Sequence, residues 1–267
     1  MVRKIIGGSY ISLILFLLYA PILLLFVYSF NMSREIGIWS PEWGFDLYVK
    51  LWSNTDLMQT VINTIVLALM AGFISTVLGT MGAIGIFYSN KRMNKTMNVL
   101  TQIPMINAEV VTAISIALIC TMFGFGRSFA SLLIGHVVLT IPFVVLSVIP
   151  KLKQMDNNLY EAVLDLGATP TKAIFLIVIP EILPGIVSGF LLAINISLDD
   201  YIITSFTKPS TFKTISTYVY DAYAKGGKSS SVPALRALFA IIFVVMIAYV
   251  VIHSIIQSRK SRLEGSR

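Results

Sequence analysis

Long runs without charged residues are the feature that most limits the possible folds of this chain. Residues 5–33 and 57–90 contain no charged side chain, and both runs exceed the roughly 20 residues that a helix needs to cross a bilayer. Only 12% of the 267 residues are charged, where a soluble domain carries about 25%. The sequence therefore predicts an all-α membrane protein with a single transmembrane domain over residues 1–267. We expect spans at about residues 7–31, 60–88, 99–123, 128–150, 173–198 and 233–258.

The basic residues are distributed as expected for a membrane protein rather than a nucleic-acid-binding one. The formal net charge is +7. If the N-terminus is cytoplasmic, the segments on that side hold twelve Lys and Arg residues and the opposite segments hold seven. Cytoplasmic loops typically carry this excess, and they face anionic membrane lipids. We therefore expect both termini in the cytoplasm and no nucleic-acid partner.

Glycines in the second predicted span indicate close helix packing. Small residues at Gly72, Gly79, Gly82 and Gly85 allow neighbouring helices to approach in lipid. A phosphate-binding loop is the alternative, but no strand precedes these glycines and no Lys-Ser/Thr pair follows them. The single cysteine, Cys120, excludes a disulfide framework or a cysteine-rich metal site. We expect no catalysis, metal or cofactor in this chain.

Residues 161–180, EAVLDLGATPTKAIFLIVIP, lie between long apolar runs and combine polar residues with recognisable helix start and stop signals. The pattern predicts a short helix over about 159–166, capped by Asn158 with Glu161 completing a capping box. Gly167 supplies a left-handed stop, and Thr169 followed by Pro170 begins a second helix. The segment therefore predicts a helix–turn–helix.

The first of these two helices is suited to docking. Its apolar face is predicted to contain Leu159, Ala162, Val163 and Leu166, which fits a groove on a partner. Its other face carries Glu161 and Asp165, an acid pair that gains little within the helix. A helix lying on the membrane is the alternative, but such helices usually carry basic polar faces. We favour docking to a partner with basic residues.

The segment resembles the EAA loop of ABC importer permeases. That loop reads E-A-A, three residues, G, nine residues, I-x-L-P. This chain has Glu161-Ala162-Val163, three residues, Gly167, nine residues and Ile177-x-Ile179-Pro180, so the spacing matches at every step. Val163 and Ile179 depart from the pattern, and both stay apolar. The resemblance implies the type I (MetI-like) permease fold, with six transmembrane helices and a cytoplasmic coupling helix.

Further segments are similar to those of PotC-type permeases for spermidine and putrescine. These are Tyr19-Ala20-Pro21-Ile22 in the first span and Ser197-Leu198-Asp199-Asp200-Tyr201 after the fifth. The resemblance implies a subunit of a polyamine importer in the bacterial cell membrane. It also implies the partners: a sister permease, two ATPase subunits that bind ATP and Mg, and an extracytoplasmic polyamine-binding protein. ATPase coupling would then fall to Glu161, Ala162, Val163, Asp165, Leu166 and Gly167.

Acidic residues are the candidates for contact with a polyamine, a flexible polycation. Glu109 lies among apolar neighbours in the third predicted span, where an acid is costly and usually functional. Asp199, Asp200 and Tyr201 follow the fifth span, about 28 Å along a helix from Pro180. The two aspartates point in different directions, so one can face a path. The alternatives are a structural hydrogen bond for Glu109 and a helix leaving the membrane at the aspartates.

Other functions stay open from the sequence alone. An ion-coupled secondary transporter for small cations would use Glu109, but the two halves show no internal repeat and no matching broken helices. A membrane-embedded enzyme would need a motif such as H-E-x-x-H, which the sequence lacks. An ABC permease for another small solute is a further alternative. His136 and His253 are each expected to be hydrogen-bonded helix residues, and Asn195 is expected to bond between helices.

Overall fold

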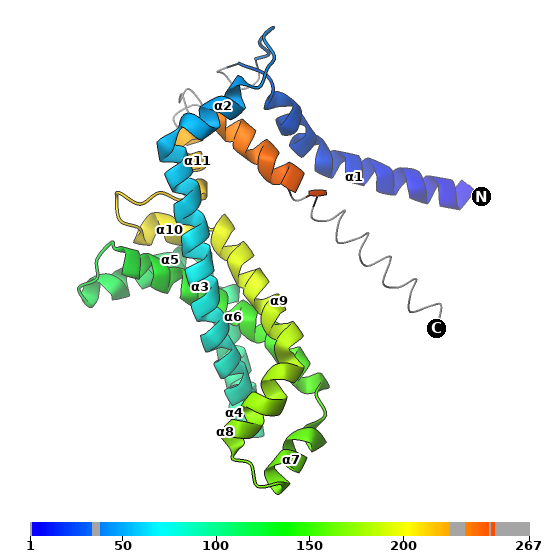
Figure 1. The fold of residues 1–267 in the computed structure, drawn as a ribbon, viewed down its shortest axis with the longest axis vertical. Coiled ribbons are helices and arrows are strands. Elements are labelled where there is room, and N and C mark those ends of the chain that lie inside the picture. The colour runs from blue at the N-terminus through cyan, green and yellow to red at the C-terminus, as the bar shows by residue number, and fades with distance from the viewer. Residues whose placement is uncertain (1, 34–37, 225–232, 246, 249–267) are drawn as a thin grey trace. The chain divides into compact units, whose positions relative to one another are not determined.

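The computed structural model describes residues 2–33, 38–224, 233–245 and 247–248, which are almost entirely helical (Figure 1). Within these residues the only extended pairing is an isolated bridge between Asn31 and Trp43. The helices are α1 (Val2–Tyr28), α2 (Asp46–Ser53), α3 (Thr55–Phe87), α4 (Lys91–Ile106), α5 (Glu109–Met122), α6 (Phe129–Gln154), α7 (Asn157–Asp165), α8 (Pro170–Ala173), the π-helical turn η1 (Ile174–Val178), α9 (Ile179–Asp199), α10 (Ile202–Thr207) and α11 (Ile215–Ala224).

The chain divides into two compact units. Unit 1 comprises Met1–Gln59 with Val219–Arg267, and unit 2 comprises Thr60–Tyr218. Unit 2 therefore contains most of α3, all helices from α4 to α10, and every residue for which the sequence predicts a functional role.

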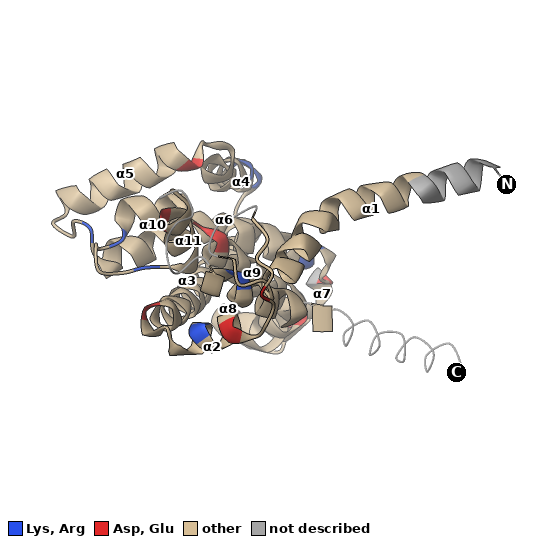
Figure 2. Ribbon diagram, turned by 90° about the horizontal axis from the view of Figure 1, so that it is seen from above, with Lys and Arg blue, Asp and Glu red and all other residues tan. Residues whose placement is uncertain are grey.

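Four helical stretches in the described residues are long and apolar enough to cross a membrane, namely Tyr10–Tyr28, Thr55–Phe87, Phe129–Gln154 and Pro170–Asp199. They correspond to the first, second, fourth and fifth predicted spans. Figure 2 shows charged residues as short patches on otherwise uncharged ribbons. The sixth predicted span appears in part as the apolar helix Pro233–Val245, and most of its remainder, with His253, lies outside the described residues. A multi-pass helical membrane protein is confirmed, while six spans stay a prediction.

The third predicted span is not one straight helix, which corrects the expectation from sequence. α4 and α5 are bent by 102°, and the two residues between them, Asn107 and Ala108, have extended backbones. Pro104 removes one hydrogen bond of α4 close to its end. Glu109 consequently lies at the first residue of α5, after a break, and not in the middle of a continuous span.

The core of unit 2 lies along α6 and α9, which run side by side (Figure 1). Val144 and Val148 of α6 and Ile182 of α9 are fully buried in one apolar cluster. A Cβ atom added to Gly189 of α9 would lie 3.2 Å from the Cα atom of Val144, so the two backbones approach closely there. This packed pair fixes the segments attached to either end of α9.

Gly79 should tolerate no larger residue, because α3 packs against α6 at this point. An added Cβ atom would lie 2.8 Å from the Cβ atom of Val144, whereas one on Gly82 meets nothing within 4 Å. Overpacking of this kind costs about 1–3 kcal/mol. We expect Gly79→Val to lower the thermal midpoint of the detergent-solubilised protein, measured by size-exclusion chromatography after heating. Gly82→Val should leave it unchanged, and equal losses in both variants would refute the packing role.

Unit 1 contains a buried arginine beside an aromatic segment. Arg236 is 2% exposed, and its Nη1 donates to the Ser33 carbonyl oxygen at 2.9 Å. Its guanidinium carbon lies 4.2 Å from the centre of the Tyr28 ring, a cation–π distance. Trp39 and Trp43 stack with centroids 5.7 Å apart and are about half exposed. Exposed tryptophans of this kind are typical of a membrane–water interface.

Candidate functional site

The predicted helix–turn–helix is present as α7, a tight turn and α8. Gly167 has a φ of +87°, the left-handed conformation that glycine adopts without strain. Thr169 caps α8 by accepting a hydrogen bond from the Lys172 amide at 3.4 Å, and Pro170 is its first residue. The predicted stop and restart are therefore confirmed.

The cap at the start of α7 differs from the prediction. Asp156 is the N-cap, and its carboxylate accepts a hydrogen bond from the Asn158 amide at 2.9 Å. Asp and Asn are about equally good caps, so the sequence did not distinguish them. α7 consequently begins at Asn157, two residues before the predicted start.

α7 presents three different faces. Tyr160 packs against the core of unit 2 and lies 5.0 Å from Tyr88, ring centroid to centroid. Glu161 and Asp165 are exposed on a second face. A third face is apolar and exposed.

This exposed apolar face consists of Leu159, Ala162 and Leu166, at positions i, i+3 and i+7. Leu159 is 47% exposed and Leu166 is 87% exposed, and Ala162 between them is also exposed. Val163 lies at the edge and is half-buried. The helix is thus held to unit 2 by one side, and a continuous apolar surface points away from it.

A line of polar residues follows the exposed side of α9. Glu181, Ser188, Asn195 and Asp199 are all exposed, and at 100° per residue they fall within about 40° of one another around the helix. The line is roughly 27 Å long, close to the hydrocarbon thickness of a bilayer. Sequence reasoning missed it, although the spacing was readable. The expected interhelical hydrogen bond of Asn195 is absent among the described residues.

The acidic residues selected from the sequence come together at one end of α9. Glu109 is the exposed first residue of α5, which packs against α10, and Asp199 and Asp200 immediately precede α10. Asp199 is exposed and Asp200 is only 5% exposed, which confirms that the adjacent aspartates point in different directions. Tyr201 follows them, half-buried, at the start of α10. Glu109 and Asp199 are thus the exposed acids of this group.

The Asp200 carboxylate is hydrogen-bonded to groups inside the protein. Its carboxylate oxygens accept hydrogen bonds from the backbone amides of Ile203 at 3.2 Å and Thr204 at 2.8 Å, so it caps α10. The Nε2 atom of His136 lies 3.4 Å from the same carboxylate. The expectation of a hydrogen-bonded His136 is confirmed, while its partner Asp200 had been assigned from sequence to the substrate path.

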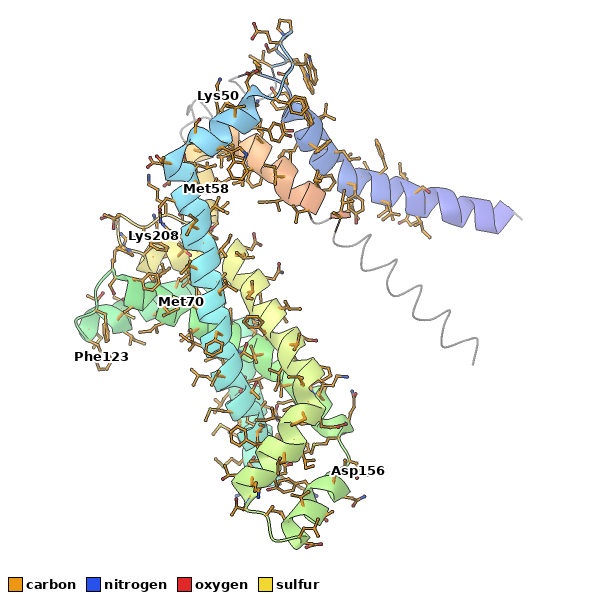
Figure 3. All side chains as sticks on the ribbon, viewed as in Figure 1. Lys50, Met58, Met70, Phe123, Asp156 and Lys208 are labelled. Carbon is orange, nitrogen blue, oxygen red and sulfur yellow. The ribbon has the colours of Figure 1, made fainter. Side chains whose placement is uncertain are left out.

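α7 and the acidic group lie towards opposite ends of unit 2. Figure 3 places Asp156, beside α7, at one end, and Phe123 and Lys208, which follow α5 and α10, far from it. α9 runs between the two regions, with its start next to α8 and η1 and its last residue Asp199 next to the acidic group. The geometry therefore combines a polar line along α9 with a separate helix, α7, whose exposed face is apolar.

Comparison with known proteins agrees with this architecture. The helices and their packing define a multi-pass membrane component. Residues 3–262 match the family of binding-protein-dependent transport system inner membrane components, and the chain belongs to this family. The resemblance to ABC importer permeases inferred from sequence is thereby confirmed.

Individual relatives and solved structures show which transport proteins the chain is similar to. The chain is 28% identical to the spermidine/putrescine permease PotC of Haemophilus influenzae over 98% of this chain and 100% of that protein. It is also 28% identical to the putrescine permease PotI of Escherichia coli, over 92% and 89% of the two chains. A bacterial ABC transporter for alginate import has a similar structure, with a TM-score of 0.71 at 18% identity over 92% of this chain and 93% of that one. The MetNI methionine transporter gives a TM-score of 0.57 at 17% identity, over 74% and 95%.

Proposed function

We propose that this chain is a permease subunit of an ATP-driven ABC importer for polyamines such as spermidine and putrescine. The observation that carries the proposal is the polar line on α9, which ends at Asp199 where α5 packs against α10. This surface forms one half of a translocation path, and a sister permease supplies the other half. The relatives named for spermidine and putrescine transport support the choice of solute.

The chemistry of the path surface suits a linear polycation. Glu181 and Asp199 lie at its two ends, and Glu109 begins α5, which packs against the helix that follows Asp199. Separated carboxylates pair with separated ammonium groups through charge-assisted hydrogen bonds. The exposed Leu191 and Leu192 between them offer apolar contact to the methylene spacers. No Lys or Arg residue lies within α9 to repel a cation.

α7 couples this path to the ATPase subunits. Its exposed apolar face enters a groove on an ATPase subunit, and Glu161 and Asp165 pair with basic residues at the rim of that groove. ATP and Mg are bound there and not by this chain, whose family comprises transport components rather than enzymes. Gly167 and the cap of α8 keep the helix at a fixed angle to α9, so movement of α7 is transmitted to the path.

The remaining partners and the orientation follow from this role. The complex contains two permeases, two ATPase subunits and an extracytoplasmic polyamine-binding protein in a bacterial cell membrane. α7 and both termini lie in the cytoplasm, in agreement with the excess of Lys and Arg on that side. Asp199 and Glu109 then lie towards the outer side, where the binding protein releases the solute.

An ABC permease for another small solute is the second candidate. The alginate and methionine transporters have the same fold, so the fold does not choose the solute. The exposed carboxylates favour a cation over an anionic polysaccharide. An ion-coupled transporter without ATPase subunits would leave the apolar face of α7 without a partner, and we therefore disfavour it.

The test is uptake of radiolabelled spermidine into proteoliposomes that contain the complete transporter. We expect uptake that requires internal ATP and the external binding protein, and that unlabelled putrescine inhibits but alginate does not. Uptake without ATP would place the chain among ion-coupled transporters. ATPase stimulation by another solute, with no spermidine uptake, would refute polyamine as the solute and leave the importer architecture in place.

A further inference from the structure

A buried polar network joins three helices of unit 2 where α9 ends. His136 of α6 is 0% exposed, and its two ring nitrogens have different partners. Nδ1 lies 2.7 Å from the Ser197 hydroxyl of α9, and Nε2 lies 2.9 Å from the Thr204 hydroxyl of α10. The Thr204 hydroxyl lies 2.7 Å from the Asp200 carboxylate, and Ser216 donates to the Asp200 carbonyl oxygen at 2.6 Å.

The hydrogen bonds admit one consistent arrangement of protons for a neutral imidazole. A carboxylate only accepts, so the Thr204 hydroxyl donates to Asp200. Thr204 must then accept from the Nε2–H group of His136, and the Ser197 hydroxyl donates to Nδ1. In this arrangement the His136, Thr204 and Asp200 side chains leave no polar atom without a partner. His136 therefore connects α9 to the capped end of α10 through consecutive hydrogen bonds.

α10 depends on this network for its position. It has only six residues, Ile202–Thr207, too few for a helix to be stable alone. Ile203 packs into the space left by Gly135, where an added Cβ atom would meet its Cγ2 atom at 2.6 Å. Arg127 holds the other end by donating to the Ser205 carbonyl oxygen at 2.7 Å. His136, about two turns into α6, contacts the capped end of α10 through Thr204.

α10 in turn supports the acidic group of the path. It packs against α5, whose first residue is Glu109, and it follows Asp199 by three residues. Ala113 of α5 and Ile203 of α10 are both fully buried in one cluster with Leu139. A shift of α10 would therefore change the spacing between the Glu109 and Asp199 carboxylates.

We infer that His136 is a positioning residue, which holds α10 through Thr204 and Asp200 and so sets the spacing of the two exposed path acids, Glu109 and Asp199. Asp200 thus serves transport from inside the protein and does not contact the solute. This inference rests on the proposed polyamine path for its transport consequence. The position of α10 itself is independent of the solute.

Two substitutions of His136 test the contacts of its two ring nitrogens independently. The amide nitrogen of His136→Gln can replace Nε2 and keep the contact with Thr204 and Asp200. His136→Asn is one bond shorter, so it reaches only Ser197. We expect His136→Asn to reduce spermidine uptake per assembled transporter roughly tenfold, the effect of one unsatisfied buried group. His136→Gln should keep uptake within about threefold of the wild type.

A double-mutant cycle with Glu109→Gln tests whether His136 acts through the path acids. If it does, His136→Asn has much less effect in the Glu109→Gln background than in the wild type. Additive effects, or equal losses for the Asn and Gln variants, would overturn the inference. If His136→Asn does not assemble with its partners, Thr204→Val provides the same cycle, because it removes the hydroxyl and keeps the side-chain shape.

Hydrogen exchange in the purified transporter tests the role of His136 in the absence of a solute. The amides of residues 202–207 should exchange faster in His136→Asn and at the wild-type rate in His136→Gln. Unchanged exchange in both variants would refute the role of His136 even if uptake fell. A wild-type transporter that does not import spermidine would refute the proposed solute, and the exchange experiment would still decide the role of His136.

Discussion

Replacing Ala162 with glutamate should abolish ATP-driven uptake while the permease remains folded. Ala162 lies at the centre of the exposed apolar face of α7, between Leu159 and Leu166. Alanine and glutamate have similar helix propensities, so the helix itself should be retained. In the assembled transporter the new carboxylate would enter an apolar groove without a partner. The expected loss is about 3 kcal/mol or more, roughly a hundredfold in affinity for the ATPase subunit.

Asn158→Glu is the matched control for this substitution. Asn158 is exposed, lies one turn earlier on α7 and belongs to the polar side with Glu161 and Asp165. The same new charge at this position should stay in water or at the rim of the groove. We expect Asn158→Glu to co-purify with the ATPase subunits in normal amounts and Ala162→Glu to lose them. Uptake and ATPase activity in proteoliposomes should follow the same order.

The opposite results would identify a different role for α7. If both variants retained the ATPase subunits, the apolar face would not be the docking surface. Equal losses in both would indicate a general sensitivity of the helix to charge. The thermal midpoint of each purified permease subunit distinguishes these results from misfolding, because the exposed position of either residue predicts little change in stability.

The local parts of this fold were predictable because short-range rules determine them. The left-handed Gly167 and the Thr169 cap with Pro170 depend on neighbouring residues alone, and the structure has both. The start of α7 was wrong by two residues, since Asp156 and Asn158 are comparable caps. The long apolar runs predicted spanning helices, but a run of apolar residues does not reveal a bend, so the break before Glu109 was missed.

The candidate site was predictable only in part, because it depends on contacts between distant segments. The sequence selected Glu109 and Asp199, and the packing of α5 against α10 brings their segments together. It could not tell which of Asp199 and Asp200 is buried, since that depends on contacts of Asp200 with α10 and with His136 of α6. The line from Glu181 to Asp199 had a readable spacing. Its significance required the burial of the opposite side of α9.

The same substitution at two neighbouring positions should therefore give two different defects. Asp199→Ala removes an exposed carboxylate, so the thermal midpoint should stay unchanged. A charge-assisted hydrogen bond to an ammonium group would be lost, which is about 1.5–3 kcal/mol. Spermidine uptake per assembled transporter should fall roughly 10- to 100-fold. ATPase subunits should still co-purify, since α7 is far from this end of α9 (Figure 3).

Asp200→Ala should instead destabilise the protein. The variant loses the cap of α10, about 0.5–2 kcal/mol, and leaves the Thr204 hydroxyl without its buried carboxylate acceptor, about 1–3 kcal/mol more. We expect a clear fall in the thermal midpoint, measured by size-exclusion chromatography after heating, in addition to reduced uptake. A stable Asp200→Ala protein with low uptake would return Asp200 to the substrate path. A destabilised Asp199→Ala protein would remove Asp199 from the substrate path, because the loss of an exposed carboxylate should not change stability.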